Sequence, residues 1–469
     1  MTRSLQADFT LLNGSLVRNV VVTMGADGLI NAVQTAEEAS STDLSVERLT
    51  GRALLPGFVN AHSHAFQRVL RGRTEHRTPG RVDDDFWSWR EAMYTAANRM
   101  TPEQIEVVTR FAYLEMLRAG FTHVAEFHYL HHQPDGTPYD DRLELSRRVV
   151  RAARTSGIGL FLVPVAYQRG GPDTPASPRQ RRFLHSTPDA FLRTFEEARG
   201  LLSDGSLPVG LGLAAHSVRA LDRPYLEALE GIDTTVHAHI NEQPREVEQC
   251  LAEHGLRPTE LMADVGLLGP QFVGVHATHL SANEIRLLGK TGATVCVCPT
   301  TERNLGDGLP PLSELVAAGT GVCVGTDSHV VIDPFAEIAA LENGERLRSG
   351  RRNALAGEGP DQGVGRALLA AGTSGGASAV AARVGHIRVG HRADLVSIDL
   401  SVPGLAGTAL GGYGAAYLRD AISLAGTASV VRDVWVGGSQ QVIDGMHPGW
   451  DRGLAAYQDV LSELAGQAN

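Results

Sequence analysis

Histidines and an aspartate recur at the ends of short apolar runs in this sequence. His62 and His64 end the first of these runs, and His239 ends a later one. Residues two apart on an extended strand face the same way, so both imidazoles of the first pair can reach one ion. Asp327 ends the last run. Three imidazoles and one carboxylate suit a borderline ion such as Zn²⁺, with an open position for water.

Two further residues stand close to these candidate ligands. Glu242 lies three residues after His239, and His276 ends another apolar run. A carboxylate beside an activated water can take up a proton and return it, and a nearby imidazole can polarise the nucleophile. We therefore predict that Glu242, His276 and Asp327 are the catalytic groups of a hydrolase.

Other histidines receive different interpretations. His279 is the main alternative to His276, which we favour because it ends its strand directly. His329, two residues after Asp327, is a candidate for orienting the ligating groups. The remaining ones are interpreted as structural mid-strand residues, His123 and His237, and as a surface-loop pair, His131 and His132.

The elements that must position these residues form a regular series. Eight β-branched runs alternate with helical segments, at residues 53–62, 121–128, 158–167, 208–216, 234–240, 272–276, 293–299 and 321–327. In one such helical segment Thr101 can cap, Pro102 takes the first helical position and Gly120 ends the helix. The series predicts an α/β fold, a parallel (β/α)₈ TIM barrel whose chemistry lies at the carboxyl ends of its strands.

The two ends of the chain differ from this central part. Residues 1–50 and 387–445 contain alternating segments with Gly-containing turns, typical of antiparallel sheet. We expect them to form one small composite β-sandwich domain. The predicted division is 1–52 for its first part, 53–386 for the barrel with the active site, and 387–469 for its second part plus a C-terminal helix.

Charge and cysteine content exclude several classes of protein. The net charge of -11 opposes electrostatic binding to nucleic acid or to anionic lipid. We expect neither a signal peptide nor a membrane span. Four cysteines are too few for a disulfide scaffold, so we expect reduced thiols in the cytoplasm, with Cys296 and Cys298 packed in the barrel.

Several segments carry a resemblance to a known family. LLPGFVNAHSHAFQ, HAHINEQ, VGVHATHL and VGTDSH resemble the metal-dependent amidohydrolase superfamily in its deaminase branch, over essentially the whole chain. FWSWRE, AEFHYLHH, AAHSVRA and CPTTERNLGDG are similar to one family of that branch, the deiminases that convert N-formimino-L-glutamate to N-formyl-L-glutamate and ammonia in histidine degradation.

The resemblance implies a role for each matching residue. It implies zinc ligands at His62, His64, His239 and Asp327, a proton-transferring carboxylate at Glu242, and a second base or polarising group at His276. It implies substrate contacts at Gln67, Arg90, Tyr129, His216 and Arg219. It also implies a small-molecule substrate, a dicarboxylate amidine, and a homodimer.

The lysine content bears on the number of metal ions. Many members of the superfamily bridge two ions with a carboxylated lysine on the fourth strand, whereas Lys290 is the only lysine here and follows the sixth strand. We therefore expect one Zn²⁺ per chain, with Fe²⁺ as the alternative metal.

The arginines bear on the substrate. The planar guanidinium groups of Arg90 and Arg219 suit two carboxylates. An alternative for Arg90 is a surface ion pair with Asp83, Asp84 or Asp85. Two other functions stay open: deamination of a guanine, thioadenosine or triazine-like ring, which would favour aromatic and amide contacts, and a catalytically silent barrel that serves as a scaffold.

Overall fold

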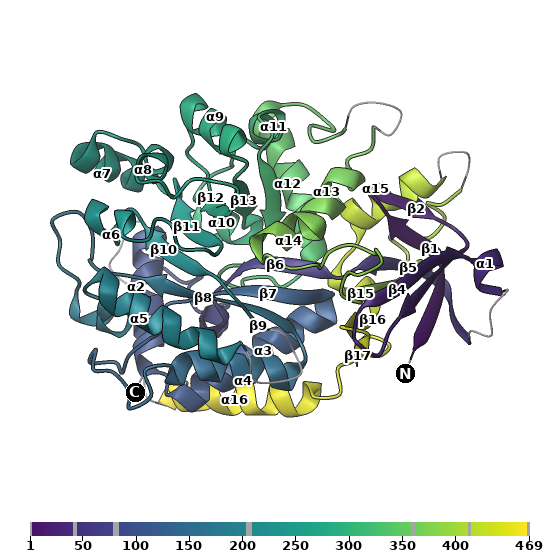
Figure 1. Ribbon diagram of the computed structural model, residues 1–469, viewed down its shortest axis with the longest axis horizontal. Helices are drawn as coiled ribbons and strands as arrows, with labels where there is room; N and C mark the ends of the chain where they lie inside the picture. The colour runs from purple at the N-terminus through teal and green to yellow at the C-terminus, as the bar shows by residue number, and fades with distance from the viewer. Residues whose placement is uncertain are drawn as a thin grey trace.

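The computed structural model describes residues 2–40, 45–77, 84–202, 209–357, 362–410 and 414–466. Figure 1 shows a large barrel surrounded by helices and a smaller sheet beside it, which contains the N-terminal strands. Two hydrogen-bonded sheets account for these parts, one of nine strands and one of eight.

The nine-stranded sheet forms the barrel. Its parallel strands follow one another in chain order, with β9 (Val209–Leu211) paired to β8 off the main path. They are β6 (Phe58–Ser63), β7 (Phe121–His128), β8 (Gly159–Ala166), β10 (Leu213–Ser217), β11 (Val236–Ile240), β12 (Phe272–His276), β13 (Thr294–Val297) and β14 (Gly321–Val324). The predicted (β/α)₈ barrel is confirmed.

The barrel closes between its first and last strands through very few bonds. The backbone N–H of Asp327 donates to the carbonyl of His62 at 3.0 Å, and the N–H of His64 donates to the carbonyl of Asp327 at 3.0 Å. The seam between β6 and β14 is therefore made by residues that the sequence predicts as metal ligands.

Helices cover the outside of the barrel. Those between β6 and the end of the barrel are α2 (Phe86–Arg99), α3 (Pro102–Ala119), α4 (Glu144–Ser156), α5 (Pro188–Ala198), α6 (Arg223–Glu227), α7 (Pro244–His254), α8 (Pro258–Asp264), α9 (Ala282–Thr291), α10 (Pro299–Leu305), α11 (Leu312–Ala317), α12 (Pro334–Ser349), α13 (Gly365–Gly372) and α14 (Ser374–Ala379). Helix α3 begins and ends as its sequence predicts: Thr101 accepts a bond from the N–H of Gln104, and Gly120 ends the helix with φ of 103°.

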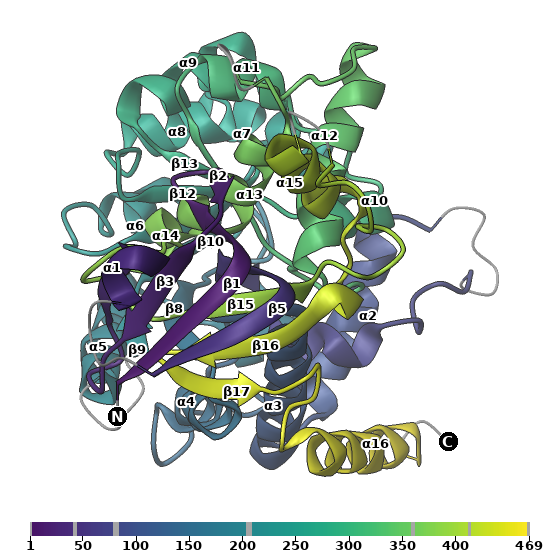
Figure 2. The ribbon, with the colours of Figure 1, turned by 90° about the vertical axis from the view of Figure 1, so that its right-hand side faces the viewer.

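The smaller sheet joins the two ends of the chain. Its order is β17-β16-β15-β5-β1-β3-β4, with β2 paired to β1. The bounds are β1 (Arg3–Leu12), β2 (Ser15–Val17), β3 (Val20–Met24), β4 (Ile30–Thr35), β5 (Val46–Pro56), β15 (Leu395–Asp399), β16 (Val431–Val436) and β17 (Ser439–Val442). Figure 2 shows the N-terminal and C-terminal strands side by side, as expected for a composite β-domain.

The first predicted barrel strand divides between the two sheets. Residues 53–56 end β5 in the smaller sheet, and the barrel strand β6 starts at Phe58. Gly57 separates them, and a Cβ at this position would lie 2.1 Å from Oγ1 of Thr122. The chain passes from one sheet to the other where no side chain fits.

The C-terminal part packs against the barrel. Helix α15 (Gly414–Ala425) contacts α12 and α13, and α16 (Trp450–Gly466) lies along α3, where Tyr457 stacks on Phe111 with ring centroids 4.5 Å apart. Helix α1 (Ala36–Ser40) flanks the smaller sheet.

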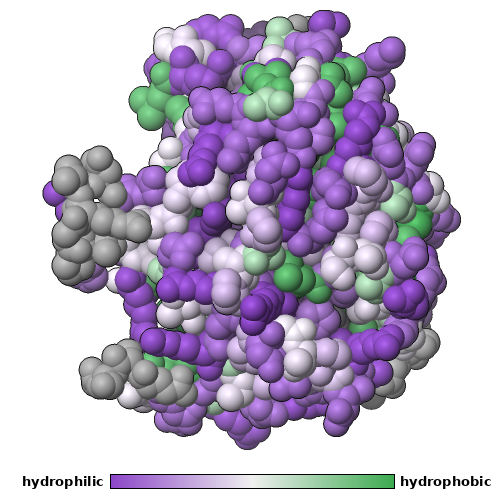
Figure 3. All heavy atoms as spheres, turned by 90° about the vertical axis from the view of Figure 1, so that its left-hand side faces the viewer, coloured by the Kyte–Doolittle hydropathy of each residue, from purple (hydrophilic) through white to green (hydrophobic). Residues whose placement is uncertain are grey.

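The face drawn in Figure 3 is mostly hydrophilic, with small separate apolar patches. Among the described residues, no helix combines the length and hydropathy needed to cross a bilayer.

Candidate active site

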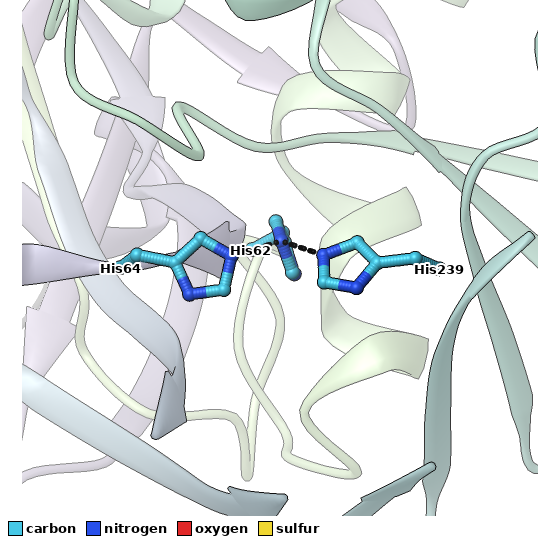
Figure 4. A group of neighbouring side chains, drawn as sticks. All are labelled: His62, His64 and His239. Carbon is cyan, nitrogen blue, oxygen red and sulfur yellow. Dashed lines mark hydrogen bonds between the residues drawn. The ribbon is translucent and has the colours of Figure 1, made fainter. Parts of the chain in front are cut away.

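Three histidines meet at the carboxyl end of the barrel. Nε2 of His62 lies 3.1 Å from Nε2 of His64 and 3.2 Å from Nε2 of His239. Figure 4 shows His64 and His239 on opposite sides of His62, with their ring nitrogens directed toward it. Because β6 and β11 lie on different sides of the barrel, only its closure brings these three rings together.

The hydrogen bonds of His64 and His239 direct their Nε2 lone pairs toward His62, whose own Nδ1 has no hydrogen-bond partner among the described residues. Nδ1–H of His64 donates to the carbonyl of Phe127 at 3.0 Å, and Nδ1–H of His239 donates to the carbonyl of His216 at 2.8 Å. Burial lowers the pKa of His62 and His239 and lowers that of His64 to about 3, so the rings are neutral. Neutral imidazoles with converging lone pairs fit a divalent cation such as Zn²⁺.

Asp327 supplies a carboxylate to the same point. Its Oδ1 lies 3.2 Å from Nε2 of His64 and 3.5 Å from Nε2 of His62. The structure therefore brings together all four residues that the sequence predicts as ligands.

Positive backbone φ angles occur where several strands end at the site. Asn241 has φ of 52°, His276 of 72° and Asp327 of 45°. Non-glycine residues adopt this left-handed region at a cost of order 1 kcal/mol or more, and such residues cluster at functional sites. The turns direct the chain away from each strand while the side chains stay buried at the barrel mouth.

His276 lies among carboxylates. Its Nε2 is 3.5 Å from Oε1 of Glu242 and 3.9 Å from Oδ2 of Asp327, and its Nδ1 is 3.2 Å from Oε1 of Glu302. Burial alone would lower the pKa of His276, but the three negative charges outweigh burial and raise it to about 10. Nε2 of His276 thus faces the carboxylates of Glu242 and Asp327 at the centre of the site.

Glu242 also contacts Arg219. Its Oε2 accepts a bond of 2.9 Å from Nη2 of Arg219, whose Nε lies 3.5 Å from Oε2 of Glu246. Burial raises the pKa of Glu246 to about 7, although Arg219 opposes that rise. The guanidinium group therefore lies between two buried carboxylates, one of which faces His276.

The predicted substrate-binding residues line a cavity beside the histidine cluster. The cavity has a volume of about 50 Å³. Gln67 donates from Nε2 to the hydroxyl of Tyr129 at 2.7 Å, and the His216 ring lies 4.6 Å from that of Tyr167. The predicted contacts among its lining residues are Gln67, Arg90, Tyr129, His216 and Arg219.

Arg90 faces this cavity from helix α2. Its guanidinium lies 4.5 Å from the ring centroid of Trp87, and its Nε has no hydrogen-bond partner among the described residues. Asp85 instead caps α2 by accepting bonds from backbone N–H groups, and Asp83 lies outside the described residues. A buried guanidinium nitrogen without an acceptor favours a ligand contact for Arg90.

Of the other candidate histidines, His279 is held away from the reaction centre, whereas His329 contacts Ser63, the residue between the proposed ligands His62 and His64, as an orienting residue would. Nε2 of His279 donates to the carbonyl of Asp307 at 2.8 Å, and His329 contacts Ser63 and Thr326. His123 and His237 are buried within strands, as expected for structural residues.

The surface interpretation of His131 and His132 is wrong. His131 is buried and donates from Nε2 to the carbonyl of Val165 at 2.9 Å, whereas His132 is half-buried and donates to the carbonyl of Leu184 at 2.8 Å. The backbone N–H groups of both histidines donate to the carbonyl of Arg182 in the loop that follows β8, a contact between distant segments that a strand-ending pattern does not reveal.

Three buried acids that support the site were not predicted. Glu302, at the start of α10, holds His276; Glu126, at the end of β7, accepts from Ser63 and from the N–H of Ala65. Asp307 accepts a short bond from Gln243, and its pKa is raised to about 9, first by burial and then by Glu242. Glu126 could have been found by its position at a barrel strand end, whereas Glu302 and Asp307 follow the seventh strand at no diagnostic spacing.

The positions of Lys290 and of the cysteines bear on how many metal ions the site can hold and on which residues would bind them. Lys290 is exposed on helix α9, far along the chain from β10, which carries no lysine. Cys296, Cys298 and Cys323 are buried and unpaired in an apolar cluster. A ligand set of His62, His64, His239 and Asp327 thus fits one ion without a lysine bridge.

Comparison with known proteins agrees with this architecture. The sequence pattern of the amidohydrolase family matches residues 53–440. The chain belongs to the amidohydrolase family. It is 40% identical over 98% of its length to a formimidoylglutamate deiminase of Pseudomonas aeruginosa, of which the match covers 98%.

Solved structures of amidohydrolases share the whole fold. A crystal structure of an amidohydrolase from Brucella melitensis is 38% identical, with a TM-score of 0.87 over 99% of this chain and 100% of that one. An adenosine deaminase from Xanthomonas campestris, determined with bound zinc, is 23% identical, with a TM-score of 0.81 over 99% and 98% of the two chains. The first similarity supports the family, and the second supports the fold.

Proposed function

We propose that this amidohydrolase hydrolyses N-formimino-L-glutamate to N-formyl-L-glutamate and ammonia, a step of histidine degradation. The observation that carries the proposal is the convergence of Arg90 and Arg219 on the cavity that adjoins the three-histidine cluster. Two guanidinium groups suit the two carboxylates of this substrate. The full-length similarity to a formimidoylglutamate deiminase supports the same choice.

We propose one Zn²⁺ held by His62, His64, His239 and Asp327. When bound, the ion supplies Lewis acidity, which makes hydroxide available near neutral pH. Glu126 and Ser63 support these ligands from behind, because the hydroxyl of Ser63 donates to Glu126 at 2.6 Å while its neighbour His64 faces the cluster. Supporting hydrogen bonds of this kind hold ligands in a fixed orientation.

Glu242 is the proposed proton carrier. It takes a proton from the attacking water as the oxygen bonds to the formimino carbon, and it passes a proton to the nitrogen that departs as ammonia. His276, held by Glu302, donates a hydrogen bond toward the developing negative charge, and Asp327 orients the nucleophile. The carbon–nitrogen bond breaks as the carbonyl of the formyl group forms, and the second proton of the water leaves the hydroxyl oxygen for Glu242. A protonated formimino group and water thus give the formyl group, ammonia and one released proton.

Arg219 keeps N–H donors that a substrate carboxylate can use. A guanidinium carries five N–H donors, of which Glu242 accepts one from Nη2, while Glu246 makes an ion-pair contact of 3.5 Å with Nε without a hydrogen bond. The two carboxylates hold the group in place before substrate enters, which reduces the entropy lost on binding. Arg90 is the proposed partner of the second substrate carboxylate.

Ammonia release provides the test. We expect steady turnover of N-formimino-L-glutamate by the zinc-loaded protein and little turnover of guanine or of adenosine analogues. Faster turnover of a purine would assign the site to ring deamination. Absence of turnover with every substrate, at one bound zinc per chain, would support the scaffold alternative.

We also propose a cytoplasmic homodimer. Four free cysteines suit a reducing compartment. The dimer rests on the family resemblance, and multi-angle light scattering during size-exclusion chromatography measures it: a mass near twice that of one chain is expected, and a monomer mass contradicts the proposal.

A further inference from the structure

A second cavity lies outside the active site, between the loop after β7, the loop after β8 and helix α5. Its volume is about 440 Å³, larger than that of the cavity beside the histidine cluster. The residues used in the argument below are His132, Asp135, Arg142, Arg181, His185 and Arg193, all of which line it. None of them is part of the proposed reaction.

Histidines gather at the inner end of this cavity. The ring of His185 lies 4.4 Å from that of His131 and 5.4 Å from that of His132, centroid to centroid. His185 is only 4% exposed, yet neither of its ring nitrogens has a hydrogen-bond partner in the described part of the chain. Buried polar atoms without partners are rare and need an explanation, of which a missing ligand is one.

His185 is a neutral ring in this setting. Burial, followed by the neighbouring His132, lowers its pKa to about 3. A neutral imidazole carries one N–H, and that donor has no acceptor here. Both ring nitrogens are closed off from solvent in this structure, so an acceptor group entering the cavity would satisfy the donor once the ring turns toward it.

Positive charge surrounds the opening. Three arginines line the cavity: Arg142, which pairs with Glu197 at 3.3 Å, and the exposed Arg181 and Arg193. The single lining carboxylate, Asp135, already accepts two bonds from Thr137. Guanidinium groups around a concave site favour small oxyanions.

A metal ion fits this cluster less well than an anion. Nε2–H of both His131 and His132 donates to a backbone carbonyl, which directs those nitrogens away from a shared centre. The metal-competent groups among the described residues do not include any of these three histidines. The arginines would also repel a cation.

The cavity shares a wall with the active site. Phe183 and Tyr129 line the active-site cavity, whereas Leu184 and His185 line the second one. The carbonyl of Leu184 accepts the hydrogen bond from Nε2 of His132, so a residue that lines the second cavity fixes the backbone of this shared wall. An occupant there would contact the segment that carries an active-site residue.

We propose that this second cavity binds a small oxyanion, either a carboxylate or a phosphate, through Arg181, Arg193 and His185. The ligand would accept from the unpartnered ring nitrogen at the floor and from guanidinium groups at the rim. Binding there does not require the proposed catalytic function, so each can fail without the other.

Isothermal titration calorimetry on the zinc-loaded protein tests the site, with inorganic phosphate and glutarate titrated separately. The variant Arg181→Ala/Arg193→Ala removes two exposed rim charges and is expected to fold, which its melting temperature checks. Arg199→Ala is the matched control, because Arg199 pairs with Glu196 just after α5 and lies outside the lining. Arg219→Met removes a carboxylate contact in the active site and so separates the two sites; its melting temperature is checked as well, because the variant leaves Glu242 and Glu246 without their cation.

We expect at least one anion to bind with a Kd of about 1 mM or tighter, a scale that corresponds to about -4 kcal/mol. Its affinity should fall tenfold or more in the double variant and persist in Arg199→Ala and Arg219→Met. Phosphate alone, glutarate alone or both identify the chemical source. Binding of neither anion, or unchanged affinity in the double variant, overturns the proposal.

As a second readout, ¹⁵N-histidine spectra should show the ring signals of His185 shifting with the bound anion. His185→Phe identifies those signals by their loss. Spectra without an anion-dependent shift of these signals would contradict the assignment of His185 to the site.

Discussion

The contacts of Glu242 suit the proposed role of proton carrier. One carboxylate oxygen lies 3.5 Å from His276, and the other accepts a hydrogen bond from Arg219. The side chain is therefore fixed beside the three-histidine cluster, of which it is not a member. A fixed carboxylate within reach of both water and the leaving nitrogen needs no rearrangement between the two proton transfers.

Replacing this carboxylate should stop catalysis while leaving the metal in place. For Glu242→Gln we expect a fall in kcat of about a hundredfold or more, the usual contribution of one positioned proton-transfer group. Ammonia release measures turnover, and elemental analysis measures bound metal. Unchanged turnover would remove Glu242 from the mechanism.

Glu302 acts through His276, so we classify it as a positioning residue. Glu302→Gln keeps the size of the side chain but removes the charge that holds Nδ1 of His276. We expect kcat to fall about tenfold or more, since partners that orient functional groups typically contribute 10–100-fold. KM should change little, because the cavity lining stays intact. An equal loss in both parameters, or a loss of metal, would indicate a merely structural role.

Arg219 should affect both substrate affinity and stability. Arg219→Met leaves Glu242 and Glu246 buried without their cation, which typically costs about 3–5 kcal/mol in the free energy of unfolding. We also expect KM to rise at least tenfold, because a guanidinium-to-carboxylate contact is lost.

Arg90→Met provides the comparison, since Arg90 has no ion pair among the described residues and its loss should raise KM with little change in stability. Steady-state kinetics and urea unfolding of both variants separate the effects. A rise in stability for Arg219→Met together with unchanged KM would contradict the assigned contact.

At the level of elements, the strand ends were predictable and their surroundings were not. His62, His64 and His239 stand where apolar runs end, which is a local signal. Glu302 reaches His276 from a helix on a different βα unit, so the pairing depends on barrel closure and leaves no trace in spacing.

The division of the first predicted strand had no local signal either. Leu54 and Leu55 are as fully buried in the smaller sheet as Phe58 and Val59 are in the barrel. One continuous apolar run therefore serves two sheets, and only the tight contact at Gly57 marks the change. Apolar periodicity reports burial, but not which sheet provides it.

Helix α12 carries a buried acid, Glu337, whose titration should make the free energy of unfolding depend on pH. Glu337 accepts bonds from the hydroxyl and the N–H of Thr300, and burial raises its pKa to about 8 from a usual value near 4.5. The folded state therefore holds a proton that the unfolded state releases, and stability contributed by this group falls as pH rises from about 4.5 to about 8. The slope is at most about 1.4 kcal/mol per pH unit.

The neutral isostere should remove this dependence. We expect Glu337→Gln to lessen the loss of unfolding free energy between pH 6 and pH 8, measured by urea unfolding at both values. An identical pH slope in the variant and the unchanged protein would show that Glu337 is not protonated in the folded state.

For the whole molecule, the metal should stabilise the fold as well as the reaction. The proposed ligands come from β6, β11 and the residues after β14, so one ion would connect strands from distant parts of the chain. A ligand that binds only the folded state raises stability by RT ln(1 + [L]/Kd). Chelation should therefore lower the melting temperature by several degrees, and added Zn²⁺ should restore it.

Elemental analysis accompanies this measurement. Protein purified without added metal should hold about one ion per chain. Two tightly bound ions, or a melting temperature that does not respond to chelation, would contradict a single centre held by these residues.

Because the barrel closes through His62, His64 and Asp327, the stability of the seam between β6 and β14 should depend on the bound cation. The two backbone amides that bridge β6 and the residues after β14 flank side chains which, without a cation, direct unshared electron pairs at one another. Solvent deuterium should enter those amides faster when the ion is stripped, well before the rest of the barrel loosens. Loss of the metal would then open the barrel locally, between β6 and the residues after β14, while its other strand pairs stay hydrogen-bonded.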